Sequence, residues 1–123
     1  MAVSSDFEAF AHDLFSGLGE VRSKRMFGGS SLYAGELLFA LLDDDCIWIK
    51  VDAQNEAAFL DAGSPKFTYP MKDGRSMEMN YRRLPDEALD DPAEATRWGR
   101  MGIEAALRKK SAKPPRKPRK KKT

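Results

Sequence analysis

The fold of this chain is decided by residues 26–85, which read MFGGSSLYAGELLFALLDDDCIWIKVDAQNEAAFLDAGSPKFTYPMKDGRSMEMNYRRLP. Short apolar runs alternate here with turn residues, which is typical of antiparallel strands joined by tight connections. The dipeptide Asp73-Gly74 is a strong hairpin signal, because both central positions of such a turn need a positive φ. Ile47, Ile49 and Val51 recur at every second position, which predicts a strand with one apolar face.

Helical patterns flank and interrupt these strands. Ser5, Asp52 and Asp91 are good N-caps, and each precedes a segment with helical spacing of apolar residues. Hairpins with few helices indicate an α+β fold of two layers, an antiparallel sheet with the helices on one face. The predicted order is α-β-β-β-β-α-β-β-α, with a helix at 5–19, strands at 21–27, 30–33, 36–42 and 46–51, a helix at 53–62, strands at 66–70 and 76–81, and a helix from Pro92.

The predicted third strand, residues 36–42, is apolar on both faces. A strand that alternates normally would turn polar side chains to water on one face. This pattern therefore predicts a central strand, or a sheet whose second face is covered by another surface such as a second subunit.

Charge is divided unevenly along the chain. Residues 1–107 contain 11 basic and 19 acidic residues, a net charge of −8, whereas residues 108–123 contain ten basic residues and no acidic one. Residues 111–123 consist only of Lys, Arg, Pro, Ala, Ser and Thr, a composition that cannot bury a core. We expect a folded domain over residues 1–107 and a disordered basic tail over residues 108–123.

A flexible row of positive charge is typical of an arm that binds DNA or RNA, because displaced counterions give affinity without sequence preference. The alternatives are a solubilising tail and a tail that folds back on its own acidic domain. The residues predicted to contact nucleic acid are Arg108, Lys109, Lys110, Lys113, Arg116, Lys117, Arg119, Lys120, Lys121 and Lys122.

A second, weaker candidate for nucleic-acid binding is the sheet itself. Aromatic residues on strands can stack on bases when cations lie beside them. Strand aromatics are more often core or cross-strand partners. The residues concerned are Lys24, Arg25, Lys72, Arg75, Arg82 and Arg83 with Tyr33, Tyr69 and Tyr81.

The residues that could carry catalysis do not form a convincing set. His12 is the only histidine and Cys46 the only cysteine; we interpret the first as a helix-surface residue and the second as a half-buried strand residue. Residues 43–45 are three consecutive aspartates, which we interpret as a solvated turn, since consecutive turn residues do not converge on a cation. Gly28-Gly29 lacks the Gly-Lys-Ser/Thr of a phosphate loop and favours a bulge or a close backbone approach. The sequence predicts no enzyme, no cofactor and no metal site.

Three features of the sequence bear on cellular location: the cysteine count, the first residues and the length of the apolar runs. A lone Cys46 forms no intramolecular disulfide, and the first residues show no basic and apolar signal pattern. The longest apolar run, residues 37–42, is far shorter than a membrane span. We expect a cytoplasmic protein with no membrane partner.

The order of several short motifs resembles the N-terminal domain of the TfoX/Sxy family of bacterial proteins. The most specific are Met26-Phe27-Gly28-Gly29, Lys50-Val51-Asp52, Phe67-Thr68-Tyr69 and Met71-Lys72-Asp73-Gly74, and the similarity extends over residues 7–107. The resemblance implies a two-layer domain of the secretion-chaperone-like kind and no catalytic residue. Family members with an assigned role regulate competence genes together with the cyclic-AMP receptor protein and carry a second, helical domain. This chain is expected to be a stand-alone member without that domain.

Two functions remain open at this point. The first is a non-enzymatic transcription co-regulator that associates with DNA or RNA through the basic tail and acts with a transcription factor or another protein. The alternative is a dimeric protein-binding or chaperone-like module in which the tail is incidental. A homodimer is compatible with both.

Overall fold

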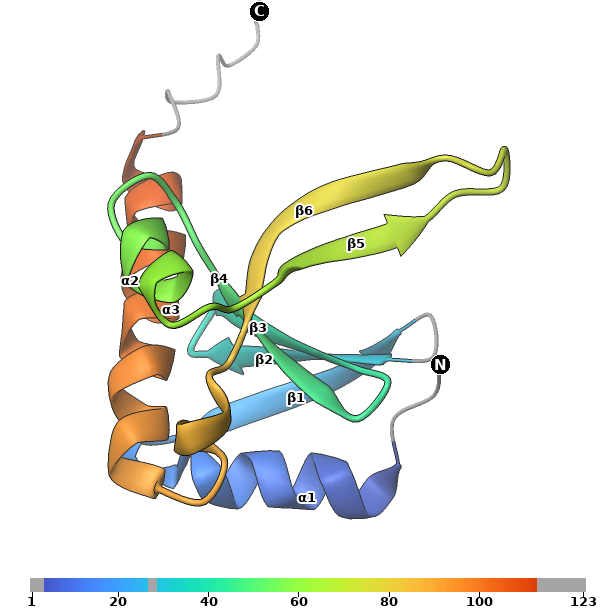
Figure 1. Cartoon of the computed structure of the whole chain (residues 1–123). Helices are drawn as coiled ribbons and strands as arrows, with labels where there is room; N and C mark the ends of the chain where they lie inside the picture. The colour runs from blue at the N-terminus through green and yellow to red at the C-terminus, as the bar shows by residue number, and fades with distance from the viewer. Residues whose placement is uncertain (1–3, 27–28, 113–123) are drawn as a thin grey trace, which may run out of the picture.

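The structure, a computed structural model, describes residues 4–26 and 29–112. The predicted order of helices and strands is confirmed (Figure 1). Two short 3₁₀ turns, η1 (Ser16–Leu18) and η2 (Asp86–Ala88), accompany them. The elements are α1 (Ser5–Leu14), β1 (Val21–Met26), β2 (Gly29–Ala34), β3 (Leu37–Asp43), β4 (Cys46–Lys50), α2 (Glu56–Asp61), β5 (Lys66–Pro70), β6 (Ser76–Arg83) and α3 (Pro92–Ala112).

The strands form one antiparallel sheet of six strands in the order β1-β2-β3-β4-β6-β5. The chain passes through α2 between β4 and β5, and β6, rather than β5, is the neighbour of β4. The β5–β6 hairpin therefore joins the sheet only through the end of β6, and its tip projects away from the domain (Figure 1).

The helices cover one face of this sheet, as predicted. Leu32, Ala40 and Ile49 lie opposite one another on β2, β3 and β4 and are fully buried. Gly102 of α3 lies directly on this row, since a Cβ built there would lie 2.8 Å from Cγ2 of Ile49. A close helix–sheet approach of this kind requires Gly, because any larger side chain would displace the sheet residue beneath it.

A β-bulge brings an extra aromatic ring into the core. Ala40 lies opposite Leu32 but Leu38 lies opposite Tyr33, so that Phe39 is the additional residue on β3. The Phe39 ring meets the Phe15 ring edge to face, with 5.5 Å between their centroids. Edge-to-face pairs of this kind stabilise a core beyond the area that they bury.

The third strand is central, as its apolar pattern predicted, because β3 lies between β2 and β4. On the face opposite the helices, Leu41 lies beside Trp48, and the Trp48 ring packs on Phe67 of β5 at 4.9 Å between centroids. The base of the β5–β6 hairpin thus covers part of the second face of the sheet.

The first helix ends earlier than predicted. The helix expected over residues 5–19 stops at Leu14 and continues as the 3₁₀ turn η1. The N-cap is Ser4 rather than Ser5, and its hydroxyl accepts a hydrogen bond from the Phe7 N–H at 3.0 Å. Glu8, in the first turn of α1, forms an ion pair with Arg25 of β1 at 3.0 Å.

The last helix runs further than predicted, and the boundary expected after Leu107 falls inside it. α3 continues to Ala112, so that Arg108, Lys109 and Lys110 belong to the folded domain. Lys and Arg are good helix formers, and cations are favourable in a last turn, where they face the negative end of the helix dipole. The disorder predicted for the rest of the basic tail concerns residues outside the described part of the chain.

No helix among the described residues is long and apolar enough to cross a membrane.

Candidate interaction surfaces

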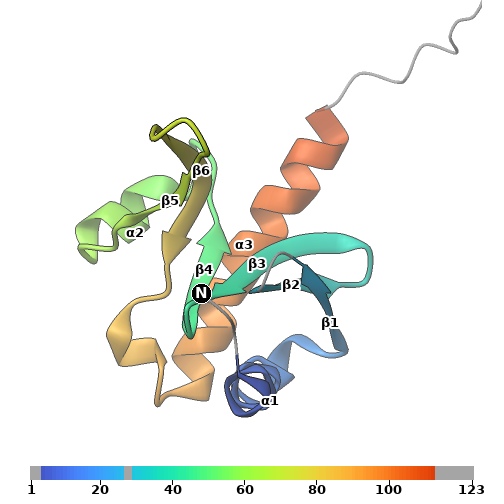
Figure 2. The ribbon, with the colours of Figure 1, turned by 90° about the vertical axis from the view of Figure 1, so that its right-hand side faces the viewer.

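The C-terminal end of α3 extends away from the sheet (Figure 2). Its last residues include Arg108, Lys109 and Lys110, the part of the basic tail that the structure describes. Arg108 is held by Asp52, with Nε donating to Oδ2 at 2.7 Å and Nη2 donating to Oδ1 at 2.9 Å. This two-bond contact holds the pKa of Asp52 below its usual value. Arg108, one of the residues predicted to contact nucleic acid, thus ties α3 to the connection after β4.

Lys109 and Lys110 are exposed on the same turn. Burial and, to a smaller extent, the positive charge of Lys109 lower the pKa of Lys50. Lys110 Nζ lies 3.9 Å from a Glu36 carboxylate oxygen, but both side chains are mostly exposed, so that this ion pair stabilises little. The end of α3 is thus a locally basic surface on an otherwise acidic domain. The other predicted contact residues, Lys113 to Lys122, lie outside the described residues.

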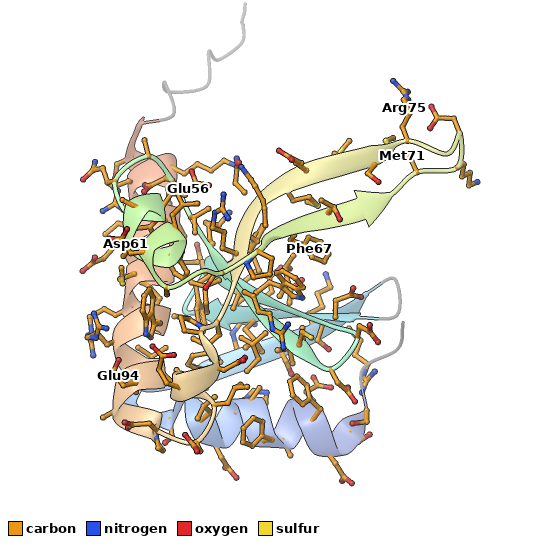
Figure 3. All side chains as sticks on the ribbon, in the orientation of Figure 1. Glu56, Asp61, Phe67, Met71, Arg75 and Glu94 are labelled. Carbon is orange, nitrogen blue, oxygen red and sulfur yellow. The ribbon has the colours of Figure 1, made fainter. Side chains whose placement is uncertain are left out.

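The structure does not bring the second basic candidate together. Each described Arg of that set lies beside a carboxylate: Arg25 with Glu8, Arg75 with Asp73, Arg82 with Glu56 and Arg83 with Asp86. Arg75 lies at the hairpin tip, far along the ribbon from the body of the sheet (Figure 3), and Lys72 belongs to the same turn between β5 and β6.

The two tyrosines of that candidate whose side chains are described are also engaged. The Arg22 guanidinium lies 5.6 Å from the centroid of the Tyr33 ring, and Lys50 Nζ lies 4.9 Å from that of Tyr81. Burial, with a smaller effect from Tyr33, raises the pKa of Tyr81 to about 12. Rings that already face a cation inside the chain offer little surface for stacking on bases.

His12 has a partner that the sequence did not indicate. Its Nε2 lies 3.0 Å from the Ser23 hydroxyl, which joins α1 to β1. A serine nucleophile would need a carboxylate on the other imidazole nitrogen and donors for an oxyanion. Within residues 4–26 and 29–112, no carboxylate is paired with this histidine. The contact is therefore best interpreted as a link between the two layers.

Cys46 is half-buried at the start of β4, as predicted. The three aspartates form a tight turn, as predicted, in which Asp44 and Asp45 have φ values of 54° and 55°. The described part of the chain holds no group of three or more His, Cys, Asp or Glu side chains arranged to bind a metal ion.

Gly29, the last residue of the Met-Phe-Gly-Gly motif, permits a close backbone approach, as predicted. A Cβ built on it would lie 2.5 Å from the Leu42 carbonyl oxygen. This glycine is therefore a determinant of the sheet rather than part of a phosphate loop. Gly28 lies outside the described residues.

A shallow cleft lies where the α2–β5 connection meets the end of β6. It holds ≈ 200 Å³ between Ser64, Arg83 and Asp86, less than the ≈ 300–1,000 Å³ typical of small-molecule sites. Arg83 lies 3.7 Å from Asp86 across the cleft. The cleft therefore gives little support to a small-molecule function.

The projecting hairpin is a surface that sequence reasoning missed. Met77 on β6 is 48% exposed, and Met71 at the tip is 38% exposed (Figure 3). The sequence does contain a sign of this surface. In residues 76–81, Ser-Met-Glu-Met-Asn-Tyr, apolar and polar residues alternate, which is typical of a strand with one apolar face that another surface can cover.

Comparison with known proteins identifies the family of this chain. A family model described as the TfoX N-terminal domain matches residues 13–106. The chain therefore belongs to the TfoX N-terminal domain family, as the motifs predicted. Protein Sxy of Escherichia coli (strain K12) is 26% identical to it over 96 residues, which cover 78% of this chain. The matched region covers 46% of Sxy, so that the chain spans about half the length of that relative.

Proposed function

We propose that this protein is a non-enzymatic regulator, similar in role to the competence regulators of its family, that associates with DNA or RNA through its basic C-terminal end. The observation that carries the proposal is the concentration of basic residues from the last turn of α3 to the end of the chain. Since Asp52 neutralises Arg108, nine cations remain for an external partner, from Lys109 to Lys122.

The described residues support binding rather than catalysis. His12, Cys46 and the aspartate turn each have a structural role, and most arginines of the domain are paired with its own carboxylates. Residues 1–112 carry 14 basic and 19 acidic residues, whereas residues 113–123 carry seven basic residues and no acidic one. The acidic domain repels a polyanion, so that contact would be confined to the basic end.

The test is a titration of labelled duplex DNA and of RNA, followed by fluorescence anisotropy at several salt concentrations. Two chains are compared, the full chain and a truncation after Ala112 that keeps the Arg108–Asp52 contact. We expect the full chain to bind with a log–log salt slope of about −5 or steeper, because each neutralised phosphate contributes roughly −0.9 on duplex DNA. We expect the truncation to lose most of this affinity.

Two results would overturn the proposal in different ways. Equal binding by both chains would assign the contact to the folded domain. No binding by either chain at low salt would remove nucleic acid from the function and leave protein partners. A parallel titration with polyglutamate distinguishes nucleic acid from any polyanion.

The second candidate is a protein-binding or chaperone-like module, and the exposed methionines of the β5–β6 hairpin favour it. Flexible, polarisable Met side chains adapt to varied apolar partners. A pull-down with the full chain, compared with Met77→Lys, tests whether captured proteins depend on the hairpin.

A further inference from the structure

The β5–β6 hairpin has a free edge. β4 pairs with β6 only from Trp48 to Lys50, opposite residues 81–83, and one further hydrogen bond joins the Val51 N–H to the Asn80 carbonyl at 2.9 Å. From Ser76 to Met79, the described residues place no strand on the side of β6 away from β5. This part of the sheet is a two-stranded ribbon, and isolated ribbons are marginally stable in water.

The backbone groups on this edge can be identified. In an antiparallel ladder, the N–H and C=O of alternate residues point to the same side of the strand. The Asn80 carbonyl points toward β4, whereas the Arg75 carbonyl accepts from the Met71 N–H inside the hairpin. Ser76 and Glu78 alternate with Arg75 and share the orientation of Asn80, so that their backbone N–H and C=O groups point to the free side. The Val51–Asn80 and Met71–Arg75 hydrogen bonds give this assignment independently.

The other edges of the sheet carry more protection against strand pairing than this one does. The outer strand β1 carries Arg22, Lys24 and Arg25, and the outer strand β5 begins at Lys66 and ends at Pro70. Charged residues and proline are the usual means of preventing association at an edge. Residues 76–79, Ser-Met-Glu-Met, contain one charged residue, Glu78, and no proline.

We propose that the free edge of β6 from Ser76 to Met79 pairs antiparallel with the same edge of a second copy of this chain, forming a two-fold dimer. An antiparallel edge is complementary to itself, because a two-fold axis aligns each donor with an acceptor of the other copy. The pairing would place the exposed Met77 side chains of the two copies close to each other across the axis.

Charge favours a second copy over a charged partner. Lys72, Asp73, Arg75 and Glu78 give the distal hairpin no net charge, so that two tips meet without the repulsion of the acidic domains. Arg75 precedes the free stretch and Glu78 lies near its end. When two copies pair antiparallel about Met77, Glu78 of each copy lies opposite Ser76 of the other, so that no like charges of this stretch face each other across the two-fold axis.

The experiment is sedimentation of the full chain at about 10 µM to 1 mM, a range suited to an interface of this small size. We expect a reversible dimer. Met77→Lys should raise the dissociation constant tenfold or more, and Leu60→Lys, at a residue 54% exposed on α2, should leave it unchanged.

A second measurement does not depend on tolerance of lysine in the hairpin. In a Cys46→Ser background, Met77→Cys should form a disulfide between copies under mild oxidation, and Leu60→Cys should not. A chain that stays monomeric at every concentration overturns the proposal. So does a dimer that forms equally with Met77→Lys or that links equally through position 60.

Discussion

Gly29 and Leu42 show how one residue can set the spacing of two strands. A methyl group on Gly29 would enter the space of the Leu42 carbonyl oxygen, at 2.5 Å. The same construction on Gly17 meets the Thr96 hydroxyl at 2.6 Å, which is the end of a side chain that can rotate. The Leu42 carbonyl oxygen, in contrast, is a backbone atom, so that it can move only if β3 moves.

We therefore predict that Gly29→Ala lowers the free energy of unfolding by about 1–3 kcal/mol, the usual cost of overpacking. Gly17→Ala should cost clearly less. Urea unfolding followed by circular dichroism compares the two variants. Equal losses would contradict the steric reading of Gly29.

The Asp52–Arg108 contact gives a pH dependence with a defined sign. The folded state holds the pKa of Asp52 below its usual value, mainly through the Arg108 hydrogen bonds. The stability from this ionised group is present above the unfolded pKa of about 3.9 and is lost as the pH falls through the folded pKa.

Asp52→Asn keeps a side-chain oxygen for the Gln54 N–H but removes the charge. We predict a loss of about 1 kcal/mol at pH 7 that disappears in acid, since the pair is partly exposed. Thermal unfolding from pH 2 to 7 measures the difference. Asp73→Asn, at the exposed pair with Arg75, is the control and should show no measurable loss. A loss at Asp52 that is constant across pH would contradict the electrostatic explanation.

Among the elements, the β3–β4 hairpin carries a correctable strain. Asp44 and Asp45 both lie in the left-handed region, at φ values of 54° and 55°, which Gly occupies without a steric penalty. Relief of this strain, roughly 1–2 kcal/mol, exceeds the cost of the greater freedom of Gly in the unfolded chain, so that we predict that Asp44→Gly raises the free energy of unfolding by about 0.5–1 kcal/mol. Asp61→Gly, at the end of α2, should lower it, because Gly disfavours a helix. Calorimetry of the two variants gives the sign of each change directly.

For the whole molecule, the boundary between fold and C-terminal segment is testable by truncation. Residues 113–123 contain only Lys, Arg, Pro and Thr, with no side chain suited to a core. A chain ending at Ala112 should therefore unfold at the same temperature as the full chain. A chain ending at Leu107 should unfold at a lower temperature, because it loses Arg108 and leaves Asp52 without its partner. Equal melting of all three chains would contradict the assignment of Arg108 to the fold.

Local signals predicted most of this architecture. Alternating apolar residues and glycine turns located the strands, and β5 begins and ends where its sequence predicted, at Lys66 and Pro70. The Asp91 cap of α3 was also found, with its carboxylate accepting from the N–H groups of Ala93 and Glu94.

The features that the sequence did not predict depend on contacts between residues that are distant in the sequence. Arg108 reads as part of a charged tail until Asp52, 56 positions away, is placed beside it. The free edge of β6 follows from strand order, which no local pattern determines. The pairing of His12 with Ser23 likewise requires the packing of α1 on β1.

The two tryptophans lie on opposite sides of the sheet, each beside a phenylalanine. Trp48 packs on Phe67 of the hairpin, and Trp98 of α3 packs on Phe59 of α2 at 4.7 Å between centroids. The chain thus carries an intrinsic fluorophore in each layer. With Trp98→Phe, the remaining emission would report the hairpin side alone, and with Trp48→Phe, the helical side alone. Loosening of the ribbon could then be watched separately from melting of the helices, without any attached dye.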